Sequence, residues 1–384
     1  MMHLSRTLAG LLLAVLWGGP GPVHAQSSLP ADAPDALRQF DTDLTNTTVD
    51  LSSLRHGGPS KDGIPSIDNP SFVSVEAARD WTDPEEPVIL IEHNETAKAY
   101  PLQILTYHEI VNDRIGGTPV AVTFCPLCYS SIAFERRLNG EPVTFGVSGL
   151  LRKSDLVMYD RKTETLWQQF TGTAIAGDRA GETLKVIPSQ LISFRQFARN
   201  YPDGRVLSRD TGYDRPYGQN PYAGYDDIDE SPFAYDGSTD DRRLPPKAKV
   251  VAVSLDGTHK AYPHSTTKKK RVIHDAIGAR PLVVLHAPGA VSALDARQIS
   301  KSKEVGSTGV FDRRVDGRTL TFTYAGDGRF EDRETGSIWT ITGRAVEGPL
   351  KGTQLERIPH GDYFAFAWFA FRPDATLYDG GPGS

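Results

Sequence analysis

Short runs of apolar and β-branched residues, separated by turn-forming pairs, dominate the chain from Pro87 onward. This pattern is typical of β-strands, which are short and bounded by glycine, proline and asparagine. Between two such runs, Asn139-Gly140 predicts a tight hairpin turn, because both central positions of that turn need positive φ. The strands predicted in the first half cover residues 88–92, 120–124, 132–136, 143–147, 156–159 and 184–187.

Helical patterning is rarer than strand patterning along this chain. The best candidate covers residues 192–200 and ends just before Pro202. Residues 26–84 are rich in Ser, Asp, Pro and Gly, and we interpret them as an extended lead-in to the first domain. The predicted fold class is therefore mainly β (α+β), with few short helices.

The pattern of residues 85–209 returns, in the same order, in residues 248–384. An ordered self-similarity of this kind indicates a repeated structural unit. We therefore predict two tandem, diverged repeats of one β-rich domain, joined by a Tyr-, Asp-, Gly- and Pro-rich linker at 210–247. The matched positions are Ala99-Tyr100-Pro101 with Ala261-Tyr262-Pro263, Asp113 with Asp275, Asp160-Arg161 with Asp332-Arg333, and Trp167 with Trp339.

The first 25 residues have the layout of a secretory signal peptide, in which Arg6 precedes a short apolar run and Ala25 offers a small residue for cleavage. The run is too short to span a bilayer, so we expect a soluble protein that is periplasmic or secreted. The chain has 42 basic and 48 acidic residues and a net charge of −6. This mildly acidic balance argues against nucleic acid as a partner.

Candidate chemistry centres on Cys125-Pro126-Leu127-Cys128, which follows the predicted strand at 120–124 and contains both cysteines of the chain. In the second repeat, Cys125 falls opposite Ala287 and Cys128 opposite Ala290. Residues that both repeats share are most simply scaffold, whereas residues found in one repeat only are candidates for function. The thiols are therefore the first candidates for a site.

Two further residues are present only in the first repeat. His108 falls opposite Lys270, and Met158 falls opposite Phe330. An imidazole and a thioether, together with two thiolates, suit a soft ion such as Cu(I), or Zn²⁺ if a harder ligand replaces the thioether. His108, Cys125, Cys128 and Met158 are thus the candidate metal ligands, although a buried methionine is more often a core residue.

Two other interpretations of the cysteine pair stay open. A redox-active dithiol would use Cys125 as the nucleophile, because the first cysteine of such motifs is usually the exposed one. A structural disulfide would close a very short loop and would stabilise the fold only slightly. The second repeat has no cysteines at these positions, so a disulfide is not required by the scaffold.

Ser148, Ser154 and Asp155 lie in a stretch that the second repeat lacks, and we expect them to shape a pocket or a covering loop. A serine hydrolase is disfavoured because Gly146-Val-Ser148-Gly149 does not have the G-x-S-x-G spacing of a nucleophile elbow.

Several of these segments resemble a known family, the exported bacterial proteins grouped as domain of unknown function 3179. The resemblance covers about residues 85–245 and brings no established reaction. It implies that His108, Cys125, Cys128 and the loop at 148–155 are signature positions. It rests on A-Y-P at 99–101, H-E-I-V-N-D at 108–113, F-C-P-L-C at 124–128, F-G-V-S-G at 145–149 and S-D-L-V-M-Y-D-R at 154–161.

Together these observations predict an exported protein with a Cys-x-x-Cys/His site for binding a soft metal, copper-like or zinc, or for metal or thiol redox chemistry. Its expected partners are a metal ion or a small molecule, and a redox partner protein if the thiols cycle. The alternative is a binding or interaction module, without catalysis, in which the cysteines form a structural disulfide. The pattern leaves open whether the protein is an enzyme.

Overall fold

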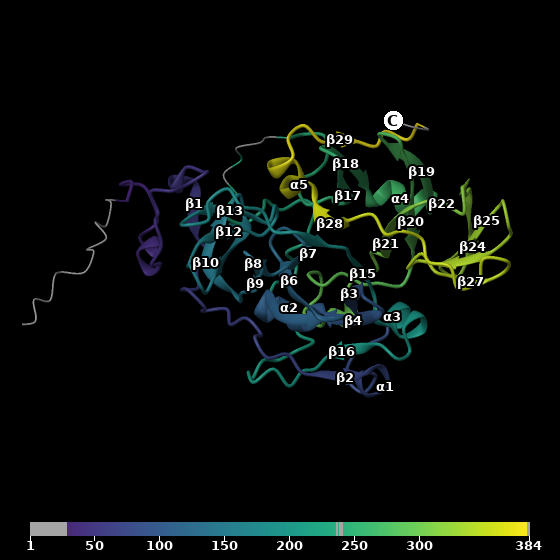
Figure 1. Ribbon diagram of the computed structural model, residues 1–384, viewed down its shortest axis with the longest axis horizontal. Helices are drawn as coiled ribbons and strands as arrows, with labels where there is room; N and C mark the ends of the chain where they lie inside the picture. The colour runs from purple at the N-terminus through teal and green to yellow at the C-terminus, as the bar shows by residue number, and fades with distance from the viewer. Residues whose placement is uncertain (1–28, 236, 238–240, 382–384) are drawn as a thin grey trace, which may run out of the picture.

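The computed structural model describes residues 29–235, 237 and 241–381 and is mostly β-structure (Figure 1). The mainly β fold class is confirmed. The signal peptide predicted at residues 1–25 lies outside the described residues. Among those described, no helix is long and apolar enough to cross a membrane.

The first half forms three sheets from residues 87–207, with strand orders β14-β7-β6-β5, β10-β11-β12-β13 and β15-β3-β4-β16. A further small hairpin pairs β8 with β9. The elements are β3 (Pro87–His93), β4 (Thr96–Pro101), α2 (Leu102–His108), β5 (Ile110–Ile115), β6 (Thr118–Cys125), β7 (Ser130–Glu135), β8 (Arg137–Leu138), β9 (Glu141–Pro142), β10 (Phe145–Arg152), β11 (Asp155–Asp160), β12 (Leu166–Gln168), β13 (Thr173–Ala176), β14 (Val186–Ile187), β15 (Ser189–Ser193), α3 (Phe194–Asn200) and β16 (Arg205–Leu207).

The second half places its elements in nearly the same order, in sheets β19-β20-β21, β24-β25-β26-β27 and β28-β17-β18-β29. In both halves the last strand pairs in parallel with the second one, as β16 with β4 and β29 with β18. The elements are β17 (Lys249–Leu255), β18 (Thr258–Pro263), α4 (His264–Lys270), β19 (Val272–Ile277), β20 (Arg280–Ala287), β21 (Ser307–Asp312), β22 (Arg314–Val315), β23 (Arg318–Thr319), β24 (Phe322–Gly326), β25 (Arg329–Asp332), β26 (Ile338–Thr340), β27 (Ala345–Glu347), β28 (His360–Phe364), α5 (Ala365–Phe371) and β29 (Thr376–Leu377).

Matching side-chain contacts accompany this matching order of elements. Trp167 donates its indole N–H to Asp160 at 3.0 Å, and Trp339 donates to Asp332 at 2.8 Å. The hydroxyl of Tyr100 likewise donates to Asp113, as that of Tyr262 does to Asp275. A buried polar group needs such a partner, so these pairs are structural. That both halves derive from one repeated unit stays a prediction, which these parallels support.

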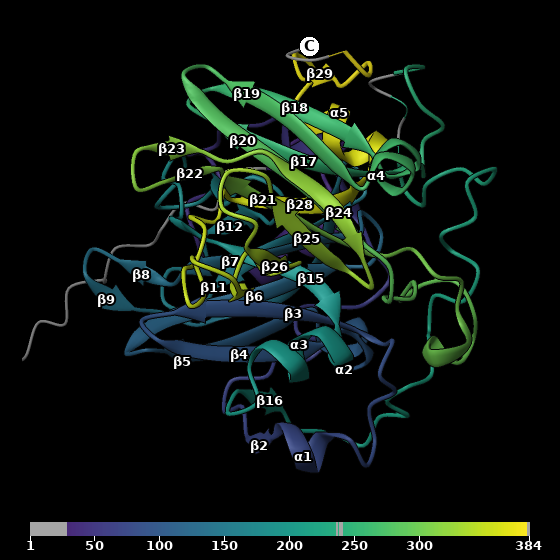
Figure 2. The same cartoon turned by 90° about the vertical axis from the view of Figure 1, so that its right-hand side faces the viewer.

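The two halves pack into common cores along their central strands. Strands β15 and β7 of the first half contact β21 and β28 of the second, and Figure 2 shows these four strands near the middle of the molecule. One core contains Phe124 and Trp167 together with Phe364 and Trp368. A second core joins Phe197 to residues of the other half. Each half therefore buries apolar surface that it would otherwise expose to water.

The lead-in is less extended than its composition predicts, because it adds strands to sheets of the first half. β1 (Leu54–His56) pairs with β10, and β2 (Phe72–Ser74) pairs with β16 and precedes the short helix α1 (Val75–Ala78). Leu37 and Phe40 are also buried there, in a cluster with Tyr159. The polar composition of the lead-in does not predict these pairings, because they depend on strands that are distant in the sequence.

Turn and cap residues account for the local structure that was predicted correctly. Asn139 and Gly140 adopt φ of 51° and 82° between β8 and β9, which confirms the hairpin. The predicted helix exists but begins at Phe194, because Ser193 and Gln196 form a capping box in front of it. The helix α2 was not predicted, since it is short and six of its seven residues are buried.

Gly149 allows the lead-in to approach β10 closely. Its φ is +78°, and a Cβ at this position would lie 2.2 Å from the carbonyl oxygen of Pro59. Gly117 has a similar φ of +82°, but a Cβ there would meet nothing within 4 Å.

We predict that Gly117→Ala lowers the free energy of unfolding by about 1–2 kcal/mol, the cost of backbone strain alone. Gly149→Ala should cost at least about twice as much, because it adds a clash with backbone that cannot move freely. Urea denaturation of the two variants measures the difference. Equal losses would show that the lead-in does not pack against β10 as described.

Candidate metal centre

The cysteine pair lies in a tight connection between two buried strands. β6 ends at Cys125, which pairs with Ser130 at the start of β7. Tyr129 adopts a φ of 55° and so turns the chain back within four residues. The second half supports this turn, because the amide of Phe364 donates to the carbonyl oxygen of Cys128 at 3.0 Å.

A second hairpin brings a carboxyl group to the cysteines. β10 and β11 are joined by Lys153 and Ser154, whose φ values of 52° and 68° are typical of a two-residue turn of the I′ type. Asp155 is the first residue of β11 and is fully buried. Its carboxylate accepts hydrogen bonds from the side-chain amide of Gln168 at 2.7 Å and from the backbone N–H of Phe170 at 2.9 Å.

Cys125, Cys128 and Asp155 form a compact group of potential metal ligands. One ligand atom from each residue lies within 4.8 Å of the others, and all three residues are buried. Neither cysteine is in a disulfide. The thiol of Cys125 also lies 3.9 Å from the carbonyl oxygen of Ser154, which belongs to the same hairpin turn.

The electrostatics of this group are unusual because it is acidic throughout. Burial raises the pKa of Asp155 to about 7, although the hydrogen bonds from Gln168 and Phe170 lower it. Burial also raises the pKa of Cys125 and of Cys128. Within the described parts of the chain, no basic side chain forms an ion pair with Asp155. A bound cation would supply the missing positive charge.

A fourth acidic group, Glu109, lies beside these three. It follows the last residue of α2 with a φ of 58°, a strained value for a residue with a side chain. Its backbone carbonyl accepts from the amide of Phe124, next to Cys125. Burial raises the pKa of its carboxyl group to about 8, and the Tyr222 hydroxyl, 3.4 Å away, is its side-chain partner.

His108 is not part of the group of three. Its Nδ1 atom lies 2.7 Å from the carbonyl oxygen of Pro65, and its Nε2 atom lies 2.6 Å from the hydroxyl of Tyr217. Both ring nitrogens therefore have other partners, and a ligand role for His108 stays a prediction. In the motif H-E-I-V-N-D, the neighbouring residue Glu109 is closer to the thiols, because its negative charge raises the pKa of Cys125.

Met158 is fully buried in the core, where it pairs across the sheet with Val147 and Trp167. A ligand role for its thioether also stays a prediction. The expectation that Cys125 would be exposed is wrong, because it is only 2% exposed and Cys128 is 0% exposed. The cover that the linker provides could not be deduced from the motif alone.

The two serines of the predicted pocket stabilise backbone instead of lining the cavity described below. Ser148 bonds within its own sheet, donating to the carbonyl of Val157 and accepting from the amide of Leu150. Ser154 donates to the carbonyl of Phe233 at 2.5 Å and so ties the hairpin turn to the linker.

The linker at 210–247 covers the site with tyrosines. Tyr225 donates its hydroxyl to the carbonyl of Leu127 at 3.2 Å, directly over the cysteine turn. Tyr222 contacts Glu109, as described above. Both tyrosines also line a cavity of about 640 Å³, whose wall further includes Glu109, Leu127 and Leu156.

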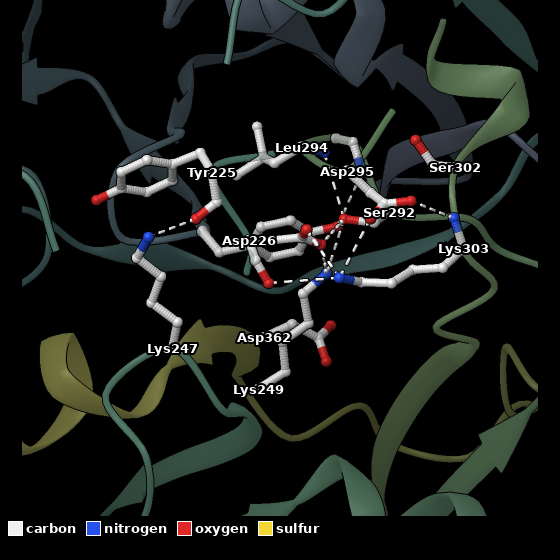
Figure 3. A network of polar contacts seen from close by, with 12 residues as sticks. Tyr225, Asp226, Lys247, Lys249, Ser292, Leu294, Asp295, Ser302, Lys303 and Asp362 are labelled. Atoms are coloured by element: carbon white, nitrogen blue, oxygen red, sulfur yellow. Dashed lines mark hydrogen bonds and ion pairs between the residues drawn. The ribbon is translucent and has the colours of Figure 1, made fainter. Parts of the chain in front are cut away.

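A polar network fixes this cover to the second half (Figure 3). The Asp226 carboxylate accepts from the Ser292 hydroxyl and, at 2.9 Å, from the ammonium group of Lys303, while Lys249 lies 3.8 Å away. Burial raises the pKa of Asp226, but the attractions of Lys249, Ser292 and Lys303 together outweigh it, so the pKa is lower than usual. Ser292 and Lys303 belong to the stretch between β20 and β21, which is longer than the matching turn of the first half. The second half therefore positions the cover of the first.

The corresponding place in the second half has no such donor atoms. β20 ends at Ala287 where β6 ends at Cys125, and Ala290 follows at the position of Cys128. The β24–β25 hairpin is shorter than the β10–β11 hairpin, and in the register set by Asp160 with Asp332 its Arg329 matches Val157, so the stretch that contains Asp155 has no direct counterpart. The two thiols are thus replaced by alanines, and the hairpin that carries Asp155 is shortened.

The comparisons with known proteins now identify the family. The family model described as "Protein of unknown function (DUF3179)" matches residues 61–375. The chain belongs to this family. The match extends over both halves and so reaches well beyond the 85–245 that the motifs predicted. No curated protein and no solved structure matches the chain.

The sequence predicts Cys125 and Cys128 as ligands but does not predict Asp155 as a ligand. Asp155 was expected only as a pocket residue, and Glu109 was not singled out at all. Both were visible in the motifs S-D-L-V-M-Y-D-R and H-E-I-V-N-D. The motifs do not show that the β10–β11 hairpin lies beside the cysteine turn, which brings Asp155 close to Cys125.

The raised pKa of Asp155 predicts how stability changes with pH in metal-free protein. A carboxyl whose folded pKa is above its unfolded value binds more protons when folded, so its contribution is present below about pH 4 and is lost as pH rises through about 7. Asp155→Asn removes this dependence. Between about pH 5 and about pH 8, wild type should lose stability relative to the variant, by at most about 1.4 kcal/mol per pH unit.

Urea denaturation at several pH values, in the presence of a chelator, measures this difference. Parallel curves for wild type and Asp155→Asn would contradict the burial of an uncompensated carboxyl group.

Proposed function

We propose that the first half of this protein binds a thiophilic metal ion, zinc before copper, through Cys125, Cys128 and Asp155. The observation that carries the proposal is the convergence of two free thiols and a carboxylate within 4.8 Å. In a tetrahedral zinc site with Zn–S bonds of about 2.3 Å, neighbouring ligand atoms lie about 3.5–3.8 Å apart. The group would need to contract by only about 1 Å.

The buried acids support a ligand role more strongly than a redox role. Redox-active cysteines depend on a lowered pKa and on access to their partner, because the thiolate is the reacting species. Here burial raises the pKa of both thiols. A metal ion reverses this effect, since it displaces the thiol protons and compensates the negative charge that remains.

The oxygen ligand favours zinc over copper. Thiolates and carboxylates are both common zinc ligands, whereas Cu(I) selects thiolates and thioethers. Asp155 offers an oxygen on the same side as the thiols, and its carboxylate is oriented by Gln168 and Phe170. Such outer hydrogen bonds are typical of metal-binding carboxylates. Copper with Met158 as a ligand is the second candidate, and it would require rearrangement of the core.

Export to an oxidising compartment belongs to the same proposal. It rests on the signal-peptide pattern of residues 1–25. Two neighbouring thiols would be open to oxidation in such a compartment, and a bound metal protects them because ligated thiolates are not free to pair. Whether the bound metal also takes part in a reaction depends on what reaches it.

We predict that purified mature protein binds one equivalent of zinc and that Cys125→Ser, Cys128→Ser and Asp155→Asn each weaken binding. Loss of one thiolate should cost at least about tenfold in affinity, and loss of the carboxylate a similar factor. Competition against a chromophoric zinc chelator measures these affinities, and elemental analysis gives the stoichiometry.

His108→Gln and Met158→Leu serve as controls, because His108 hydrogen-bonds to Pro65 and Tyr217 and Met158 is buried in the core. They should bind zinc within about threefold of wild type. Zinc binding that survives in the Cys125→Ser/Cys128→Ser double variant would contradict the proposal. A reversible disulfide without metal binding would favour the redox interpretation instead.

A further inference from the structure

The cavity beside the metal centre has the size and lining of a small-molecule site. Its volume of about 640 Å³ lies within the range of about 300–1,000 Å³ that is usual for ligand pockets. Val147, Leu150 and Leu151 of β10 line one wall, and the linker tyrosines line another. Most of the surface is therefore apolar, and a ligand would gain stability by burying an apolar body there.

One carboxyl group stands in this apolar wall without a basic partner. Glu109 is 7% exposed, and the hydroxyl of Tyr222 is the side-chain partner of its carboxyl. The strained backbone at this residue holds the carboxyl in place at the end of α2. A buried carboxyl without a positive partner is unfavourable, so it marks a position where a ligand can contribute charge.

The metal centre cannot supply that positive charge. Two thiolates and one carboxylate carry three negative charges, one more than a divalent cation balances. Lys247 is the basic residue in the cavity wall, but its ammonium group donates to the carbonyl of Tyr225 at 2.7 Å and lies over the ring of that tyrosine. Glu230, also in the wall, further balances its charge.

From this cavity and the buried Glu109 carboxyl, which has no basic partner, we propose that the pocket binds an organic amine, with its apolar body among the leucines and its ammonium group on Glu109. A carboxylate ligand would repel the ionised form of Glu109, and a neutral ligand would leave this carboxyl without a positive partner. An ammonium group forms a charge-assisted hydrogen bond there, which is about twice as strong as a neutral one. Tyr222 and Phe233 also line the cavity, and aromatic rings attract cations.

The amine site does not depend on the proposed metal function, because Glu109 is not a member of the group of three ligands. The two proposals can therefore fail separately. If both hold, the amine is the class of small molecule that is brought next to the metal centre.

Calorimetric titration with phenethylamine, phenethyl alcohol and phenylacetate tests the proposal on wild-type protein. These probes share one apolar body and differ in charge. The amine should bind at least about tenfold more tightly than the alcohol, which follows from the strength of a hydrogen bond to a charged group. Equal affinities for amine and alcohol, or a preference for phenylacetate, would overturn it.

Two matched variants locate the amine's partner. Glu109→Gln should lose at least about tenfold in amine affinity and little in alcohol affinity, whereas Glu230→Gln, the same change elsewhere in the wall, should lose less than about threefold. Equal losses in both variants would assign the effect to general charge and overturn the proposal. Cys125→Ser/Cys128→Ser should retain amine binding, which separates this result from the zinc measurement. If Glu109→Gln does not fold, Ala223→Phe fills the cavity instead and should abolish amine binding; amine binding unchanged in that variant would overturn the proposal.

Discussion

The burial of three acidic groups without a basic partner is the constraint on which this structure depends. Cys125, Cys128 and Asp155 are removed from water by both halves of the chain, and burial raises the pKa of each. A protein gains nothing in stability from such a group unless something compensates its charge. In the metal-free protein, the two thiols and the carboxyl group avoid this charge by staying protonated. A metal ion would compensate it with its own charge, and the geometry is already close to what it requires.

The second half has alanines at the positions of Cys125 and Cys128, yet it contacts the first half's site. Its strand β28 ends at Phe364, which bonds to the cysteine turn, and its long connection after β20 holds Asp226 of the linker. The linker in turn places Tyr222 and Tyr225 over the thiols. In this account, one half carries the chemistry and the other excludes water from it. A half without these thiols can therefore still contribute to the surroundings of the site.

Local patterns predicted the elements that local forces determine. The strands of the first half, the Asn139-Gly140 hairpin and the helix that begins at Phe194 follow from alternation, turn propensity and capping. The pairing of β1 with β10 and the position of the linker depend on contacts between distant residues, which no local pattern contains. The residues of the candidate site also fall into those that local sequence predicts and those that it does not. The cysteines are neighbours in sequence and were located, whereas Asp155 and Glu109 reach them only through separate hairpin and helix ends.

X-ray absorption at the zinc edge of the zinc-loaded protein tests the central claim most directly, because it reports the atoms that surround the metal. The account predicts two sulfur ligands at about 2.3 Å, together with oxygen at about 2.0–2.2 Å, and the loss of one sulfur in Cys128→Ser. A shell of only nitrogen and oxygen would contradict it, since the metal would then be bound away from Cys125 and Cys128.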